Sequence, residues 1–188
     1  MWDERSPAHA ASPDYAVQQL IAYPNRLSDV VRFDRARLGA VSSLRGVHLQ
    51  CHIGTDTISL ARLGARMTGL DFSAAAVTIA RDIAQSAGVA VDYVESDAYD
   101  APEVLGRNIF DLVYTGVGAL VWLPAVRRWA DVVARLLRPG GRLFLREGHP
   151  VLWALDEMRT DVIAFDYPAN GTTGWARSSP RSSKSALS

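Results

Sequence analysis

The sequence predicts an α/β fold of the doubly wound class, with a mainly parallel sheet covered by helices on both faces. Short apolar runs alternate with segments of helical period, and glycine or proline residues separate them. Parallel neighbours require a crossover connection, which is nearly always right-handed. A chain of 188 residues, of which 48% are hydrophobic and 21% charged, has the size and composition of one domain with a buried core.

The first half of the chain predicts one βαβ unit that follows an amphipathic helix. Gly54, Gly64 and Gly69 punctuate this unit. The expected elements are a helix over 27–41, a strand over Val47–Gln50, a helix over Thr57–Leu63 and a strand over Met67–Leu70.

The second half continues the alternation. Ser73 is placed to cap a helix that ends at Gly88, and Pro139 stops a later helix over 126–137. The expected strands are Val89–Val94, Ile109–Thr115 and Arg142–Arg146, and the segment Asp161–Tyr167 alternates enough to be one more strand.

These patterns divide the chain into three parts. Residues 1–45 are expected to form an N-terminal tail and cap helices, and residues 46–167 a cofactor-binding core. The last part, 168–188, is rich in glycine and serine and is expected to be disordered.

Charge and cysteine content exclude several classes of protein. Twenty basic residues balance twenty acidic ones, so nothing signals a nucleic acid or an anionic membrane as partner. The single Cys51 cannot form an intramolecular disulfide, and the start of the chain lacks the apolar core of a signal peptide. The apolar run 116–126 is too short to cross a bilayer. A cytoplasmic setting is therefore expected.

The two strand ends of the first βαβ unit carry the clearest ligand signal. In open α/β sheets, ligands bind beyond the carboxyl ends of the strands. Gly54 opens a helix after the first strand, and Asp71 stands at the tip of the second, where a carboxylate can accept hydrogen bonds from both hydroxyls of a ribose. Asp71 is also well placed to cap the helix that begins near Ser73.

Five segments, in order, resemble the class I S-adenosylmethionine-dependent methyltransferases. The family's first turn reads acid-x-Gly-x-Gly-x-Gly, whereas this chain has the form HLQCHIGTDT and keeps only the last glycine. His48, Gln50 and His52 occupy the other three positions. The matching segments are 47–57, Gly69–Ser73, Ser96–Ala98, Phe110–Thr115 and Leu136–Leu143.

The resemblance implies S-adenosylmethionine as cofactor and methyl transfer to an acceptor, most simply a small molecule. By the resemblance, residues near Gly54 face the methionine portion and Thr115 the sulfonium side, with Gln50 offering an amide donor and His52 lining the carboxylate or amino end. The ribose contact is Asp71, and the implied adenine contacts are Phe72, Asp97 and Ala98. As alternatives to these cofactor contacts, Asp97 could serve only as an acid in a turn, and His52 only as a hydrogen-bonded residue of its turn.

Because the cofactor carries its own leaving group, the protein supplies mainly alignment and desolvation. Glu147 and His149, just past the fifth strand, are the candidates for a general base or for substrate binding, although a surface loop would contain the same residue types. His48 is expected to be a hydrogen-bonded core histidine, and Cys51 a small buried hydrophobe. The scattered histidines predict no metal site.

Two features leave other functions open. The family's sheet ends with two further strands, and only 41 residues follow Glu147, so the C-terminal hairpin is expected to be incomplete and the exposed sheet edge to be open to a partner subunit. The replaced glycines also allow a non-catalytic cofactor-binding or scaffold protein. An NAD(P)-dependent oxidoreductase shares the acid on the second strand but needs the Gly-x-Gly-x-x-Gly turn that this chain lacks.

Overall fold

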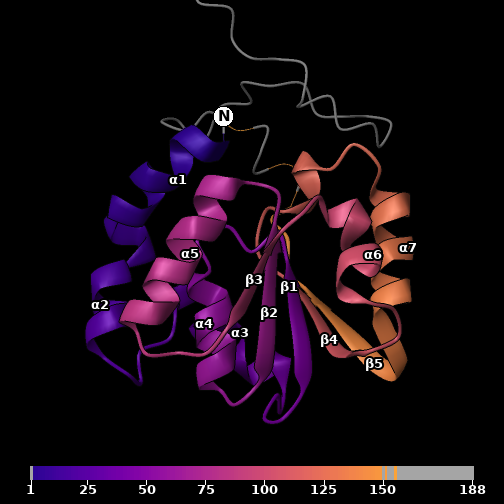
Figure 1. Cartoon of the computed structure of the whole chain (residues 1–188), viewed down its shortest axis with the longest axis horizontal. Coiled ribbons are helices and arrows are strands. Elements are labelled where there is room, and N and C mark those ends of the chain that lie inside the picture. Colours follow the sequence, from indigo (N-terminus) through magenta and orange to yellow (C-terminus); the bar gives the residue numbers. More distant parts are fainter. Residues whose placement is uncertain (1, 150, 152–154, 156–188) are drawn as a thin grey trace, which may run out of the picture.

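A five-stranded parallel sheet forms the centre of the protein in the computed structural model, which describes residues 2–149, 151 and 155 (Figure 1). The strand order is β3-β2-β1-β4-β5, so β1 lies in the middle and the chain leaves it in both directions. The strands are β1 (Arg45–Leu49), β2 (Arg66–Asp71), β3 (Asp92–Glu95), β4 (Phe110–Thr115) and β5 (Leu137–Leu145). The predicted doubly wound fold is confirmed.

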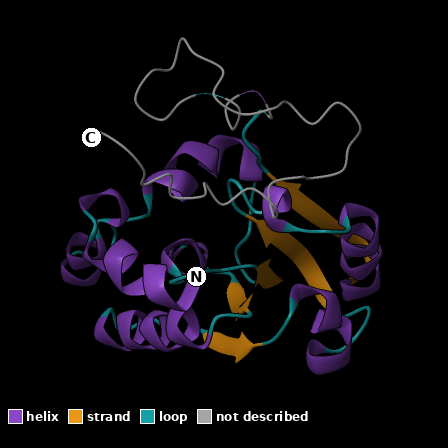
Figure 2. Ribbon diagram, turned by 90° about the horizontal axis from the view of Figure 1, so that it is seen from above, coloured by secondary structure: helices purple, strands orange, loops and turns teal. Residues whose placement is uncertain are grey.

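Helices cover both faces of this sheet, as Figures 1 and 2 show. One face packs on α6 (Ala101–Leu105) and α7 (Val126–Leu136), and the other on α3 (Asp29–Leu38), α4 (Thr55–Arg62) and α5 (Ala74–Ser86). Successive β1 residues point to opposite faces, which puts Val47 and Leu49 in the core under α7. No helix in the described part of the chain has the length and apolar character that crossing a membrane requires.

The N-terminal segment, which was expected to begin as a tail, is largely helical. It forms α1 (Trp2–Ala11), the short 3₁₀ helix η1 (Pro13–Tyr15) and α2 (Val17–Ala22). Asp3 fixes α1 to the start of α5, because its carboxylate accepts the Ser73 hydroxyl at 2.5 Å and the Ala75 N–H at 3.3 Å. Tertiary contacts therefore hold a segment whose local sequence contains few large apolar residues.

The ends of two strands differ from the expectation. β3 begins at Asp92 rather than Val89, because the Val89 N–H still bonds to the Ala84 carbonyl at the end of α5. β5 begins directly after α7, and its register against β4 shifts around Pro139. The remaining short elements are η2 (Ala98–Asp100) and η3 (Leu120–Trp122).

Side chains from β5 and the residue after it connect the last strand to α3. Arg142 donates to the carbonyls of Leu38 and Ala40 at 3.0 and 2.7 Å. Arg146 pairs with the fully buried carboxylate of Asp34, with 2.6 Å between Nε and Oδ1. The predicted strand Asp161–Tyr167, the C-terminal hairpin and the 168–188 tail lie outside the described residues.

Candidate cofactor and acceptor site

A cavity of about 660 Å³ opens at the carboxyl edge of the sheet. Its walls come from the N-terminal segment around η1, the residues before α3, the turn after β1, the tip of β2 and the loop after β4. This volume lies within the ~300–1,000 Å³ typical of small-molecule sites. Of the predicted cofactor residues, Gln50, His52, Asp71 and Phe72 line it.

The turn after β1 adopts the backbone of a glycine turn although two of its three key residues are not glycine. Gln50 has φ 57°, His52 has φ 51° and Gly54 has φ 76°, all in the left-handed region. Such a conformation costs a residue with a Cβ of order 1–3 kcal/mol. The spacing of the glycine-rich turn is therefore kept in the fold while its residue types are not.

Gly54 serves packing in this turn rather than close approach to the cavity. A Cβ at this position would collide with the Tyr93 hydroxyl and lie 2.9 Å from Cβ of Ala80. The Tyr93 hydroxyl instead donates to the Gly54 carbonyl at 3.3 Å. Gly54 is buried at the N-terminus of α4 and does not line the cavity, so its predicted contact with the methionine portion stays a prediction.

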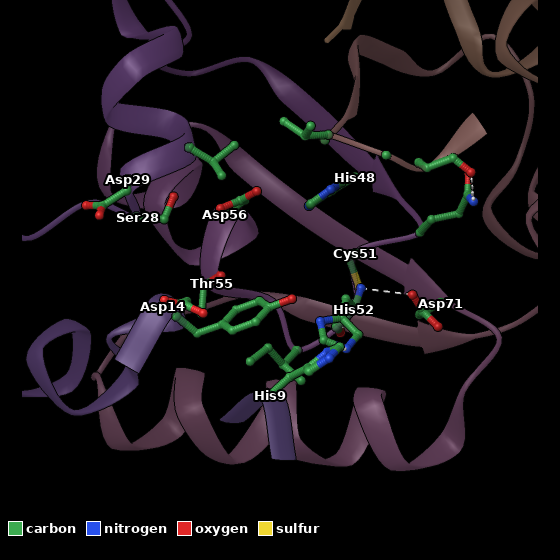
Figure 3. Close-up of a pocket in the computed structure, with 18 of the residues that line it drawn as sticks. His9, Asp14, Ser28, Asp29, His48, Cys51, His52, Thr55, Asp56 and Asp71 are labelled. Carbon is green, nitrogen blue, oxygen red and sulfur yellow. Dashed lines mark hydrogen bonds between the residues drawn. The ribbon is translucent and has the colours of Figure 1, made fainter. Parts of the chain in front are cut away.

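Asp71 links the tip of β2 to the turn after β1. Its Oδ2 accepts the His52 N–H at 2.8 Å, drawn in Figure 3, and its Oδ1 accepts the Ser73 N–H at 3.0 Å. Burial raises the pKa of this carboxyl above its usual value, and the backbone N–H donors oppose that rise. The Phe72 N–H is a third backbone donor, and the carboxylate oxygens still have lone-pair capacity for a ligand. Ser73, not Asp71, caps α5.

The side chain of Gln50 spans from the turn to the loop after β4. Its Nε2 donates to the Ala119 carbonyl at 3.1 Å, so the amide donor expected for a ligand is used within the protein. Its Oε1 is buried and has no hydrogen-bond partner among the described residues. An unpaired buried acceptor in a cavity wall is suited to an N–H or O–H of a ligand.

The His52 side chain turns toward the N-terminal segment. Its Nε2 lies 3.2 Å from Nδ1 of His9, and its ring packs on Tyr15. Burial and the neighbouring His9 lower the pKa of His52 to about 4, so the ring is neutral at physiological pH. His52 therefore holds η1 against the turn after β1.

The other predicted cofactor residues lie around the same edge of the sheet. Phe72 is 57% exposed at the mouth of the cavity. Asp97 caps η2 by accepting the Tyr99 N–H at 2.8 Å, which is the turn role, and Ala98 is buried in the core. Their adenine contacts stay predictions. Thr115 ends β4, fully buried, with an Oγ1 that has no hydrogen-bond partner among the described residues.

The two predicted catalytic residues do not line the cavity. Glu147 holds the loop after β4: its Oε2 accepts the Gly118 N–H and its Oε1 those of Ala119 and Leu120, all at 2.9 Å. His149 is exposed, and its Nδ1 accepts the Val151 N–H at 3.3 Å. A proton-transfer role for either residue stays a prediction.

His48 and Asp56, two polar residues of the cavity wall, both have strongly shifted pKa values. His48 is buried as expected, with Nδ1 2.9 Å from the Thr57 hydroxyl, and burial lowers its pKa to about 3. Asp56, which sequence reasoning missed, projects from the first turn of α4, and burial raises its pKa to about 6. The only sequence signal was an acid two residues after Gly54. Cys51 is buried as expected, with a raised thiol pKa.

Comparison with known proteins assigns this architecture. The family model of the methyltransferase domain matches residues 47–141, which is just over half of the chain. The chain belongs to the methyltransferase domain family. The matched region runs from β1 into β5 and includes the whole turn with Gln50, His52 and Gly54.

Individual methyltransferases agree with this assignment. The chain is 32% identical over 120 residues to a ubiquinone biosynthesis O-methyltransferase of Pectobacterium atrosepticum, covering 60% of this chain and 49% of that protein. For the protein of the same name from Xanthomonas oryzae pv. oryzae, identity is 35% over 139 residues, covering 71% and 56%. The chain thus spans about half the length of these curated relatives.

A solved S-adenosylmethionine-dependent methyltransferase from Mesorhizobium loti superposes with a TM-score of 0.57 at 30% identity, covering 66% of this chain and 56% of that one. The family assignment selects the methyltransferase over the nicotinamide-dependent alternative. The cofactor of this family is S-adenosylmethionine.

The cavity of this methyltransferase domain suits that cofactor in charge and in hydrogen bonding. Among the described residues, four aspartates and one arginine line it, and a sulfonium with an ammonium group is favoured by an acidic wall. Asp71 offers carboxylate lone pairs and Gln50 a free amide oxygen at the same turn. These acceptors therefore fit the hydroxyl and ammonium groups of the cofactor.

Proposed function

We propose that this protein transfers a methyl group from S-adenosylmethionine to an oxygen atom of a small-molecule acceptor. The observation that carries the proposal is the Asp71 carboxylate, fixed by the His52 N–H at the rim of an acidic cavity of about 660 Å³. The family assignment supports methyl transfer, and the names of the curated relatives support oxygen as the methyl acceptor.

The protein's part in this reaction is binding and orientation. S-adenosylmethionine, when bound, supplies an activated methyl group and its own leaving group. Asp71 is the residue we assign to the ribose hydroxyls, and the free oxygen of Gln50 to the ammonium group. Because both belong to one hydrogen-bonded turn, a displacement of either changes the alignment of the other.

Water exclusion is the second contribution. The cavity wall contains Tyr15, Leu20, Ile53 and Val117. The ring of His52 holds α1 through His9 and η1 through Tyr15 against the turn after β1. A site with little bulk water strengthens the electrostatic contacts to a cationic cofactor. The N-terminal helices therefore belong to the working site.

The proposal is tested by two measurements on one set of variants. Calorimetry gives the affinity for S-adenosylmethionine, and mass spectrometry detects S-adenosylhomocysteine and methylated product across a panel of small hydroxyl compounds. Binding that is lost in Asp71→Asn and kept in Asp131→Asn supports the proposal, since Asp131 lies exposed on α7. Wild-type protein that binds no S-adenosylmethionine would overturn it.

A non-catalytic cofactor-binding protein is the second candidate, and the replaced glycines at Gln50 and His52 favour it. It predicts cofactor binding without S-adenosylhomocysteine formation for any acceptor. Self-association through the edge strand β5 and a cytoplasmic setting also stay predictions, which sedimentation and cell fractionation measure.

A further inference from the structure

Asp56 and Asp71 stand at different parts of the cavity wall. Figure 3 shows Asp71 on one side of the pocket and Asp56 with Ser28 on the other, with His52 and Cys51 between them. If Asp71 takes the ribose, as the proposed function assumes, the Asp56 side is available to the acceptor. The inference below rests on that proposed function.

The polar atoms of Asp56 and His48 face one small space beside Gly116. A Cβ built on Gly116 would lie 3.4 Å from Oδ2 of Asp56 and 3.7 Å from Nε2 of His48. Because residue 116 has no side chain, this space is open to a ligand atom in van der Waals contact with both groups. Gly116 directly follows β4, next to Thr115.

We infer that Asp56 is the general base for the methyl acceptor, and that the methyl acceptor presents a neutral hydroxyl group in the space beside Gly116. His48 and Ser28 are positioning residues. The Ser28 hydroxyl hydrogen-bonds to Asp56, and Ser28 is itself held by its N–H bond to Ser59 at 2.8 Å. His48 is held by Thr57 at 2.9 Å.

The protonation chemistry favours Asp56 over its neighbours. A general base works best when its pKa lies near the operating pH. Burial raises the pKa of Asp56 to about 6, whereas that of His48 falls to about 3, which makes the imidazole a weak base. The charged and titratable groups around Asp56 are Tyr15 on η1, Asp34 on α3, His48 on β1, Tyr114 on β4 and Arg146 after β5.

The same wall selects the chemical class of the acceptor. A carboxylate would approach Asp14, Asp29 and Asp56. Arg26, the arginine among the described residues of the wall, is paired with Asp29 at 3.2 Å. An alkylammonium must lose its proton before it has a lone pair, and its ordinary pKa of about 10 is far above that of Asp56. A hydroxyl already has a lone pair and becomes acidic only as its oxygen is alkylated.

The bonds balance for a hydroxyl acceptor. The acceptor oxygen forms its bond to the methyl carbon as the carbon–sulfur bond breaks, and that electron pair stays on sulfur. The hydroxyl proton passes to the Asp56 carboxylate, which releases it to solvent after the product leaves. No further reactant is required.

The first test separates the acceptor subsite from the cofactor subsite. Calorimetry with S-adenosylmethionine is expected to give Asp56→Asn the wild-type affinity within about threefold, while Asp71→Asn loses tenfold or more. Asp131→Asn is the matched control, and thermal melting establishes that each variant is folded. A tenfold loss in Asp56→Asn would assign this carboxylate to the cofactor and overturn the inference.

The second test requires no turnover. Carboxyl carbon NMR of the wild-type protein is expected to show one aspartate signal that titrates between pH 5 and 7 and is missing in Asp56→Asn. A midpoint below pH 4.5 for that signal would contradict the assignment.

The third test varies only the acceptor head group, using phenol, benzyl alcohol, benzylamine and benzoate. A methyl ether from phenol or benzyl alcohol is expected, with turnover reduced roughly 100-fold or more in Asp56→Asn. Methylation of benzylamine or benzoate alone overturns the inference but leaves the proposed function standing. Equal turnover in Asp56→Asn, or no methyl ether at all, also contradicts the inference. A wild-type protein that binds no S-adenosylmethionine would instead contradict the proposed function.

Discussion

The Asp71 carboxylate accepts the backbone N–H of His52 at 2.8 Å, so the tip of β2 holds the turn that follows β1. Asp71 therefore has two roles. Its carboxylate lines the cavity, and its hydrogen bond to the His52 N–H holds a residue whose backbone is in the left-handed region. Substitutions at Asp71 and at His52 test the hydrogen bond and the backbone strain in turn.

Replacing Asp71 by Asn is expected to weaken both binding and folding. The amide keeps one acceptor oxygen, so one of the two backbone N–H groups of His52 and Ser73 loses its partner. An unpaired buried donor costs about 1–3 kcal/mol of unfolding free energy. Urea denaturation measures this loss, with Asp131→Asn as control; unchanged stability would show that the carboxylate does not hold the turn.

The left-handed conformation of His52 predicts an unusual order of stability. We expect His52→Gly to be more stable than His52→Ala by about 1 kcal/mol, because both lose the ring contacts but only glycine adopts φ 51° without strain. Thr78, exposed in the middle of α5, is the matched control, and there glycine is expected to be worse than alanine by about 1 kcal/mol. The same order at both positions would refute the strain argument.

Glu147 is expected to act on the loop after β4 through backbone hydrogen bonds. In Glu147→Gln the side-chain NH₂ faces a backbone donor, so amide hydrogen exchange of Gly118, Ala119 and Leu120 is expected to accelerate at least tenfold. Because Gln50 donates to the Ala119 carbonyl, cofactor affinity is expected to fall as well. Lost turnover with unchanged exchange and affinity would instead support a direct proton-transfer role for Glu147.

Asp56 is expected to make the protein less stable as the pH rises from about 4 to 6. Its folded-state pKa of about 6 exceeds the ordinary 3.8, so the folded state binds the proton more tightly in this window and the stabilisation is lost as the carboxyl ionises. His48 and His52 act in the opposite sense, because their lowered pKa values make stability fall as the pH drops below 6.5. The difference between the wild-type and Asp56→Asn unfolding curves isolates the aspartate; a flat difference from pH 4 to 7 contradicts the raised pKa.

The parts of the fold that follow from local sequence were predicted well. Strand and helix order depends on hydrophobic period and on breakers such as Gly88 and Pro139, which act within a few residues. The position of Asp71 at the tip of β2 was predicted because the carboxyl end of a parallel strand has a fixed place in a doubly wound sheet. These are features that a single segment determines.

The features that were missed depend on distant contacts. The α1 helix is held by the hydrogen bond between Asp3 and Ser73 at the start of α5. Asp56 became a candidate only because Gly116 and His48 lie close to it in the fold. The left-handed φ of Gln50 and His52 is imposed by the fold on residue types that rarely adopt it. The hydrogen bonds from the Glu147 carboxylate to the loop after β4 are likewise visible only in three dimensions.

The Arg146–Asp34 pair sets a lower limit on the length of any working fragment. A chain that stops before Arg146 would leave a fully buried carboxylate on α3 without its cation, and removing one partner of a buried pair costs about 3–5 kcal/mol. That loss is a large fraction of the about 5–15 kcal/mol by which an ordinary domain is stable. A fragment limited to the matched residues 47–141 would lack both Arg146 and α3, so its behaviour would say little about the intact protein.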